Sequence, residues 1–144
     1  MGTTELGGRC HCGNLSVRLV ATRDAGELPV RACACSFCAP RRLRWTTDAS
    51  GTAEIVVADE HELSRYRFGT GTADFLICRR CGSVVAAVSH GEPMRAVVNV
   101  DVLERADELQ SAVTVDFDAE DVDSRLARRA RGWTPAAVRI SCRA

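Results

Sequence analysis

Seven of the eight cysteines lie in three short clusters, and this feature restricts the fold more than any other. The first cluster is Cys10-His-Cys12, and the last is Cys78-Arg-Arg-Cys81-Gly82. Two intervening residues let the chain fold back so that both sulfurs of the last pair reach one cation at about 2.3 Å, and Gly82 permits the left-handed turn that follows. The two pairs together supply the four thiolates of a closed structural site. We therefore predict one tetrahedral zinc ion, with iron as the competing metal, held by Cys10, Cys12, Cys78 and Cys81.

The central cluster offers only three thiolates, from Cys33, Cys35 and Cys38. A tetrahedral metal held there is one ligand short, and an open position on zinc is where chemistry occurs, with a water or an incoming substrate thiol as the fourth ligand. The alternatives are a closed site completed by Cys142 or by a histidine, and a cluster without metal whose thiols take part in redox exchange. The open-site interpretation predicts two zinc ions per chain.

The rest of the sequence predicts a mainly β fold in a single domain over residues 1–144, a length that suits one hydrophobic core. Short runs with two-residue alternation or β-branched residues recur between turn-forming glycines. They predict strands at 15–20, 29–33, 54–57, 73–78, 84–88 and 96–100, followed by a last strand through Val138 and Ile140.

One segment near the C-terminus predicts a short surface helix instead. Asp118 is placed to cap a helix over residues 119–131, and Gly132 is placed to end it. The expected outer face carries four arginines, which we interpret as a solvated surface with cations suited to a helix C-terminus, rather than an anion-binding site: Arg125, Arg128, Arg129 and Arg131.

Charge and composition bear on location and partners. Nineteen arginines balance nineteen acidic residues and lysine is absent, so no overall field attracts nucleic acid or an anionic membrane. The first eight residues lack the features of a secretory signal, and no apolar run reaches membrane-spanning length. We therefore expect a cytoplasmic protein with no membrane association, in which reduced thiols bind metal rather than form disulfides.

Three motifs in this order resemble the family of glutathione-dependent formaldehyde-activating enzymes, which includes the relatives of centromere protein V. They are Gly8-Arg-Cys10-His-Cys12-Gly13, Cys33-Ala-Cys35-Ser-Phe-Cys38, and Phe75-Leu-Ile-Cys78-Arg-Arg-Cys81-Gly82-Ser83. Residues 97–103, Val-Val-Asn-Val-Asp-Val-Leu, also resemble the family's later strand and turn. Together the matches cover about residues 7–105, with 106–144 as a C-terminal extension, and three clusters in order are far more specific than one.

The resemblance implies a small β-tent of antiparallel sheets with two zinc sites. The structural role carries over to Cys10, Cys12, Cys78 and Cys81, and the catalytic zinc to Cys33, Cys35 and Cys38. It also implies a reaction between two small molecules, a thiol and an aldehyde: glutathione adds to formaldehyde to give S-hydroxymethylglutathione, and the reverse is a carbon–sulfur lyase step. The chain departs from the family pattern directly after Cys38, where it continues Ala-Pro-Arg-Arg-Leu-Arg.

Two other functions remain open at this point. One is a binding module in which zinc only stabilises a β domain whose surface meets a protein or a nucleic acid. Its best sequence feature is Arg41, Arg42 and Arg44 beside Trp45, which can contact phosphates and bases. The other is a cysteine redox protein that uses the central cluster as exchanging thiols. The resemblance favours the enzyme.

Overall fold

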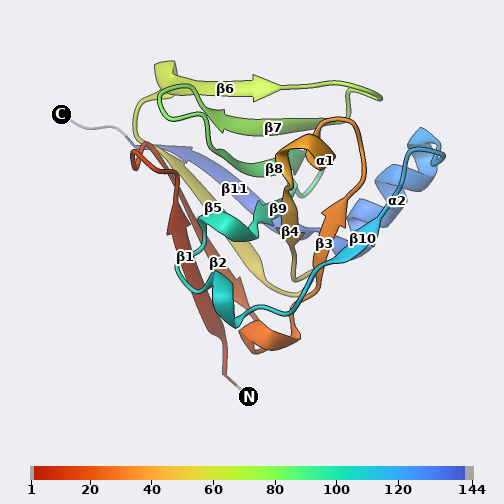
Figure 1. The fold of residues 1–144 in the computed structure, drawn as a ribbon, viewed down its shortest axis with the longest axis horizontal. Helices are drawn as coiled ribbons and strands as arrows, with labels where there is room; N and C mark the ends of the chain where they lie inside the picture. The colour runs from red at the N-terminus through yellow and green to blue at the C-terminus, as the bar shows by residue number, and fades with distance from the viewer. Residues whose placement is uncertain (1, 142–144) are drawn as a thin grey trace.

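The computed structural model describes residues 2–141, which form a mainly β fold with one helix of more than a single turn (Figure 1). The strands of this part of the chain are β1 (Thr4–Arg9), β2 (Leu15–Ala21), β3 (Val30–Cys33), β4 (Arg44–Thr46), β5 (Thr52–Val57), β6 (Leu63–Tyr66), β7 (Ala73–Cys78), β8 (Val84–Ser89), β9 (Arg95–Asn99), β10 (Val113–Val115) and β11 (Thr134–Ile140). The α-helices are α1 (Cys38–Arg41) and α2 (Val122–Gly132). Neither helix is long or apolar enough to cross a lipid bilayer.

The strands form one mixed sheet in two parts that meet at β11. One part has the order β1-β2-β5-β11, and the other runs from β10 through β3, β4, β9, β8 and β7 to β6. Strand β11 starts antiparallel to β9 and continues parallel to β5. The predicted antiparallel pairing therefore holds for most neighbours, and the parallel pairs are β11–β5 and β10–β3.

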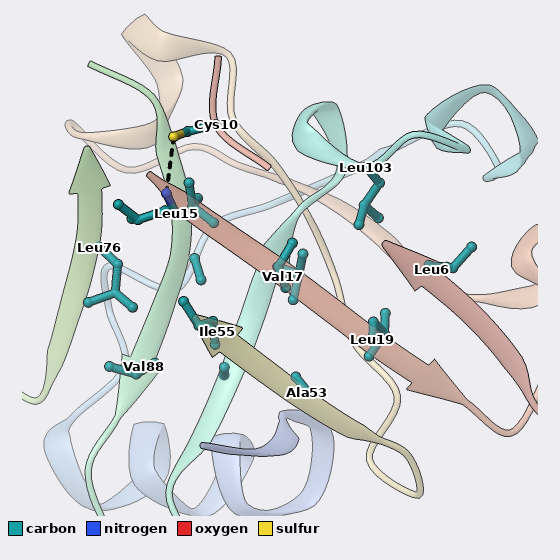
Figure 2. Packing of buried hydrophobic residues seen from close by; sticks show 14 of the residues in the cluster. Leu6, Cys10, Leu15, Val17, Leu19, Ala53, Ile55, Leu76, Val88 and Leu103 are labelled. Carbon is teal, nitrogen blue, oxygen red and sulfur yellow. Dashed lines mark hydrogen bonds between the residues drawn. The ribbon is translucent and has the colours of Figure 1, made fainter. Parts of the chain in front are cut away.

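The main hydrophobic core contains side chains from both parts of the sheet. Every second residue of β2 is buried, as expected for a strand with one covered face, and Leu15 and Leu19 lie in this core with Ile55 of β5. Leu76 of β7 and Val88 of β8 belong to the same cluster (Figure 2). Packing between the two parts thus fixes the position of β7 and the cysteine at its end.

A second hydrophobic cluster contains several aromatic side chains. Phe37 contacts Phe75, with ring centroids 4.6 Å apart, and Trp45 packs edge-on against Phe75. Ala87 of β8 and Val97 of β9 complete the part of this cluster that matters below. Strand β8 contributes to both clusters, which is why all five of its apolar residues are buried.

The predicted strands are confirmed to within a few residues at their ends, but β1, β4, β6 and β10 were not predicted. Strand β1 contains Gly7 and Gly8, which disfavour a strand by propensity. At Gly8 a bridge to Leu103 brings the backbones so close that a Cβ would overlap the Val102 carbonyl group, with its carbon at 2.7 Å. This tertiary contact therefore explains why a glycine occupies this strand position.

The predicted helix exists, but its start was placed wrongly. Helix α2 begins at Val122, and the capping residue is Asp121, whose carboxylate accepts a hydrogen bond from the Ser124 N–H at 2.7 Å. Asp118 lies in the turn before it. Both aspartates fit the capping pattern locally, and the hydrogen bond decides between them.

Candidate metal centres

Four thiols from distant parts of the chain meet at one point, which we call the tetrathiol site: Cys10, Cys12, Cys78 and Cys81. Their Sγ atoms all lie within 4.8 Å of one another, with 3.7 Å between Cys10 and Cys12 and 3.5 Å between Cys12 and Cys78. Zn–S bonds of about 2.3 Å in a tetrahedron require S···S separations of roughly 3.8 Å. The donors and their spacing thus fit a zinc ion.

Local turns position these thiols. The Gly13 N–H donates to the Cys10 carbonyl at 3.0 Å, and the Gly82 N–H donates to the Cys78 carbonyl at 2.8 Å. Both glycines have positive φ, 86° and 83°, as predicted for Gly82. The Leu15 N–H donates to the Cys10 Sγ at 3.3 Å (Figure 2), a contact that orients this side chain. Each turn therefore presents its sulfurs to a common centre.

Two thiols of the tetrathiol site, Cys78 and Cys81, differ in their pKa. Burial raises the pKa of Cys78 to about 12. Burial acts in the same direction on Cys81, but hydrogen bonds from the Ser83 hydroxyl and from backbone amides outweigh it and lower the pKa of Cys81 to about 5. A buried thiol such as Cys78 ionises only when a cation compensates its charge, so metal binding here is coupled to proton release.

A second group, which we call the trithiol site, consists of Cys33 at the end of β3, Cys35 in the following loop and Cys38 at the start of α1. Their Sγ atoms also lie within 4.8 Å of one another. The Ala39 N–H donates to the Cys35 carbonyl at 2.9 Å, and the Cys38 N–H donates to the Cys35 Sγ at 3.3 Å. A hydrogen bond from Cys38 lowers the pKa of Cys33 to about 6, and the same bond raises the pKa of Cys38.

Within residues 2–141, no histidine or carboxylate joins the three thiols as a fourth ligand. Cys142, the other candidate for that position, lies outside the described residues. The described part of the site therefore offers a metal three sulfurs, and it fits zinc with one position left for another ligand.

The trithiol site opens into a pocket of about 370 Å³. Trp45, Phe75, Ala87 and Val97 form an apolar part of its lining, and residues of α2 line another part. This volume is at the lower end of the range for small-molecule sites, which is about 300–1,000 Å³. The pocket therefore suits a small ligand that has both apolar and charged groups.

The arginines of α2 are not a solvated face, so that expectation was wrong. Arg129 is only 7% exposed, Arg125 and Arg128 are half-buried, and all three line the pocket. Arg131 is exposed, as expected. Residues at positions i, i+3 and i+4 share a helix face, and this spacing was the signal in the sequence. Whether that face points to solvent or into the pocket depends on where the helix packs against the sheet. The local sequence of the helix does not determine this.

The segment with Arg41, Arg42, Arg44 and Trp45, considered above as a nucleic-acid surface, does not present an exposed aromatic ring. Trp45 is 5% exposed and belongs to the second hydrophobic cluster, so its ring is not available for base stacking. The Arg41 guanidinium lies over the Phe37 ring at 4.1 Å, and Arg44 pairs with Asp101. This segment contributes to the pocket lining through Trp45 instead.

Comparisons with known proteins agree with this arrangement. The family model described as glutathione-dependent formaldehyde-activating enzyme matches residues 5–117, which include all three cysteine clusters and end before α2. A crystal structure of a Rhodobacter sphaeroides protein is similar in fold, with a TM-score of 0.54 and 32% sequence identity over 68% of this chain and 87% of that chain. Because the family model matches most of the sequence, the chain belongs to the glutathione-dependent formaldehyde-activating enzyme family.

Proposed function

We propose that this protein is a zinc enzyme that makes or breaks the carbon–sulfur bond between a small thiol and a small aldehyde, as in S-hydroxymethylglutathione. The observation that carries the proposal is the trithiol site, whose three described ligands face a pocket of ligand size. Family membership supports the same reaction class.

The two cysteine sites would have different roles. The tetrathiol site provides a complete set of four ligands and joins the β1–β2 turn to the β7–β8 turn, so a zinc ion there would stabilise the fold. A zinc ion held by Cys33, Cys35 and Cys38 would supply an open position that keeps a substrate thiol ionised. Chemistry therefore belongs to the second site.

The bond changes of the proposed reaction are simple. The substrate sulfur forms a bond to the aldehyde carbon, the carbonyl π bond breaks, and the thiol proton is transferred to the carbonyl oxygen. The reverse direction cleaves the carbon–sulfur bond and returns the proton to sulfur. The apolar lining formed by Trp45 and Phe75 limits the access of water to the reacting atoms.

Asp118 is the pocket residue best suited to move this proton. The pocket is lined by two carboxylates, and Glu120 is engaged by Arg128, whose Nε lies 3.0 Å from it. Asp118 makes no ion pair within 4.0 Å among the described residues. Its charge also acts on Cys33, where it partly opposes the lowering of the pKa. A carboxylate that lines the pocket and has no ion-pair partner in the described chain is the kind of group that can accept a proton and return it.

The test is the rate of adduct formation from glutathione and formaldehyde, followed by NMR against the uncatalysed reaction. We expect zinc-loaded wild-type protein to accelerate it, Cys35→Ser to abolish the acceleration, and Ser36→Ala, an exposed neighbour in the same loop, to retain it. Wild-type protein that leaves the rate unchanged would contradict the proposal. A reversible disulfide in the trithiol site of such an inactive protein would favour redox exchange instead.

A further inference from the structure

The pocket holds a buried cation, Arg129, that forms no ion pair within the described part of the chain. Nη1 of Arg129 donates to the hydroxyl of Thr72 at 2.8 Å and lies 3.4 Å from that of Ser89. Its Nε is buried without a hydrogen-bond partner. Among residues 2–141, no carboxylate lies within 4.0 Å of this guanidinium.

Burying a charge without a counter-ion is costly. Burial, together with the nearby charges of Arg125 and Arg128, outweighs the opposing charge of Glu120 and lowers the pKa of Arg129 to about 10. The group is still protonated at neutral pH. The Trp133 ring, 4.8 Å from the guanidinium carbon, holds the charged plane in place. The side chain is thus fixed, charged and able to accept another partner.

The guanidinium of Arg125, also in α2, likewise has an unfilled hydrogen-bond donor. The Nε of Arg125 is buried without a hydrogen-bond partner and lies 3.9 Å from Glu120, which is too long for a hydrogen bond. Its Nη2 donates to the carbonyl oxygen of Phe117. Glu120 itself is held by two nitrogens of Arg128, at 3.0 Å each. Among the described residues, Glu120 is therefore the one carboxylate that pairs with the arginines of α2, and these arginines have capacity to bind a further anion.

Apart from its cysteines, the pocket lining carries an excess of positive charge. Four arginines line it, the three from α2 and Arg31 of β3, against the carboxylates of Asp118 and Glu120. A ligand that brings a negative charge would therefore be favoured over a neutral ligand of the same shape.

We propose that Arg129 and Arg125 bind a carboxylate of the thiol substrate, so that the enzyme selects small thiols that carry a carboxylate. The thiol half of this statement rests on the proposed function, whereas the anion site rests on the arginines alone. Both arginines lie in α2, beyond the residues 5–117 that the family model matches. The C-terminal extension would thus add a selectivity element to the matched domain.

Calorimetric titration of zinc-loaded protein with three probes tests the inference. Glutathione carries thiol and carboxylates, its diethyl ester lacks the carboxylates, and S-methylglutathione lacks the thiol. We expect wild-type protein to bind glutathione about tenfold to a hundredfold more tightly than the ester, as a charge-assisted hydrogen bond provides. Arg129→Gln should lose this preference with little change in ester affinity. Arg131→Gln, on the exposed face, should keep it.

Two further variants guard against a folding defect. If circular dichroism shows that Arg129→Gln is unfolded, Arg125→Gln and Arg129→Lys make the same comparison. Lysine keeps the charge but not the planar fork of donors, so Arg129→Lys should retain part of the preference for glutathione. Full retention of the preference in Arg125→Gln and in Arg129→Gln, or in Arg129→Lys where Arg129→Gln is unfolded, would overturn the inference.

The outcomes separate this inference from the proposed function. Equal wild-type affinity for glutathione and its ester would overturn the inference even if adduct formation is accelerated. S-methylglutathione that binds wild type but not Arg129→Gln, without any acceleration of the reaction, would support the anion site and overturn the enzyme. Failure of all three probes to bind would overturn both. Loss of a zinc ion from Arg129→Gln would also overturn the inference, because the arginine would then support metal binding rather than bind the substrate carboxylate.

Discussion

Cys78→Ser is expected to destabilise the whole fold. Cys78 ends β7, is 0% exposed, and lies 3.5 Å from Cys12 of the β1–β2 turn, 66 positions away in the sequence. Structural zinc contributes about 10–16 kcal/mol of apparent binding free energy in small zinc peptides. Serine is a poor zinc ligand because its hydroxyl is neutral and hard. Loss of even half of that free energy, about 5–8 kcal/mol, is comparable to the entire stability of a small domain, about 5–15 kcal/mol.

The assay is thermal unfolding followed by circular dichroism on zinc-loaded protein. A loss of that size lowers the midpoint by about 15–25 °C at roughly 3 °C per kcal/mol, or removes the cooperative transition. Cys35→Ser is the matched control: it removes a thiol from the trithiol site, and we expect its midpoint to fall by a few degrees at most. The reasoning is refuted if Cys78→Ser has the same unfolding midpoint as the wild type. It is also refuted if the midpoint of Cys35→Ser falls as far as that of Cys78→Ser.

Two further substitutions test a close backbone contact at Gly8 and a buried carboxylate at Asp48. Gly8→Ala should cost about 1–3 kcal/mol or more in urea unfolding, because the new Cβ would overlap the Val102 carbonyl, whereas Gly7→Ala, whose Cβ would meet only the Val17 carbonyl oxygen at 4.0 Å, should cost under about 1 kcal/mol; equal effects would contradict the contact. Asp48→Asn should cost about 1–3 kcal/mol at pH 7, because the buried carboxylate accepts hydrogen bonds from the Thr22 N–H and hydroxyl at 2.7 and 2.8 Å. These bonds outweigh burial and lower the pKa of Asp48, so its stabilisation is present above its unfolded pKa of about 3.9 and is lost as the pH falls through the lowered folded value. The difference in unfolding free energy between wild type and Asp48→Asn should therefore shrink below about pH 4, and a constant difference would contradict this assignment.

The cysteine clusters could be predicted because their information is local. Two residues between Cys78 and Cys81, followed by Gly82, favour a turn that brings both sulfurs together, and the structure has that turn. The order of the three clusters then identified the family. The long buried strands were predictable for a similar reason, because β-branched runs such as β8 carry the pattern within themselves.

What could not be predicted depends on contacts between distant segments. The inward orientation of Arg129 is set by the docking of α2 near Thr72, which lies 57 positions away. Strand β10 has only three residues and is defined by its parallel pairing with β3. Trp45 beside three arginines has the composition of an exposed binding surface, but packing against Phe75 places its ring in the pocket lining. In each case tertiary contact overrides the local pattern.

The central claim is that the trithiol site holds a second metal ion for chemistry, beside a structural ion in the tetrathiol site. The most direct measurement is the zinc content per chain, by elemental analysis, of protein purified without added zinc or chelator. The account predicts two zinc ions in wild type and one in Cys35→Ser. One zinc ion per chain in the wild type, with Cys35→Ser unchanged, would contradict it.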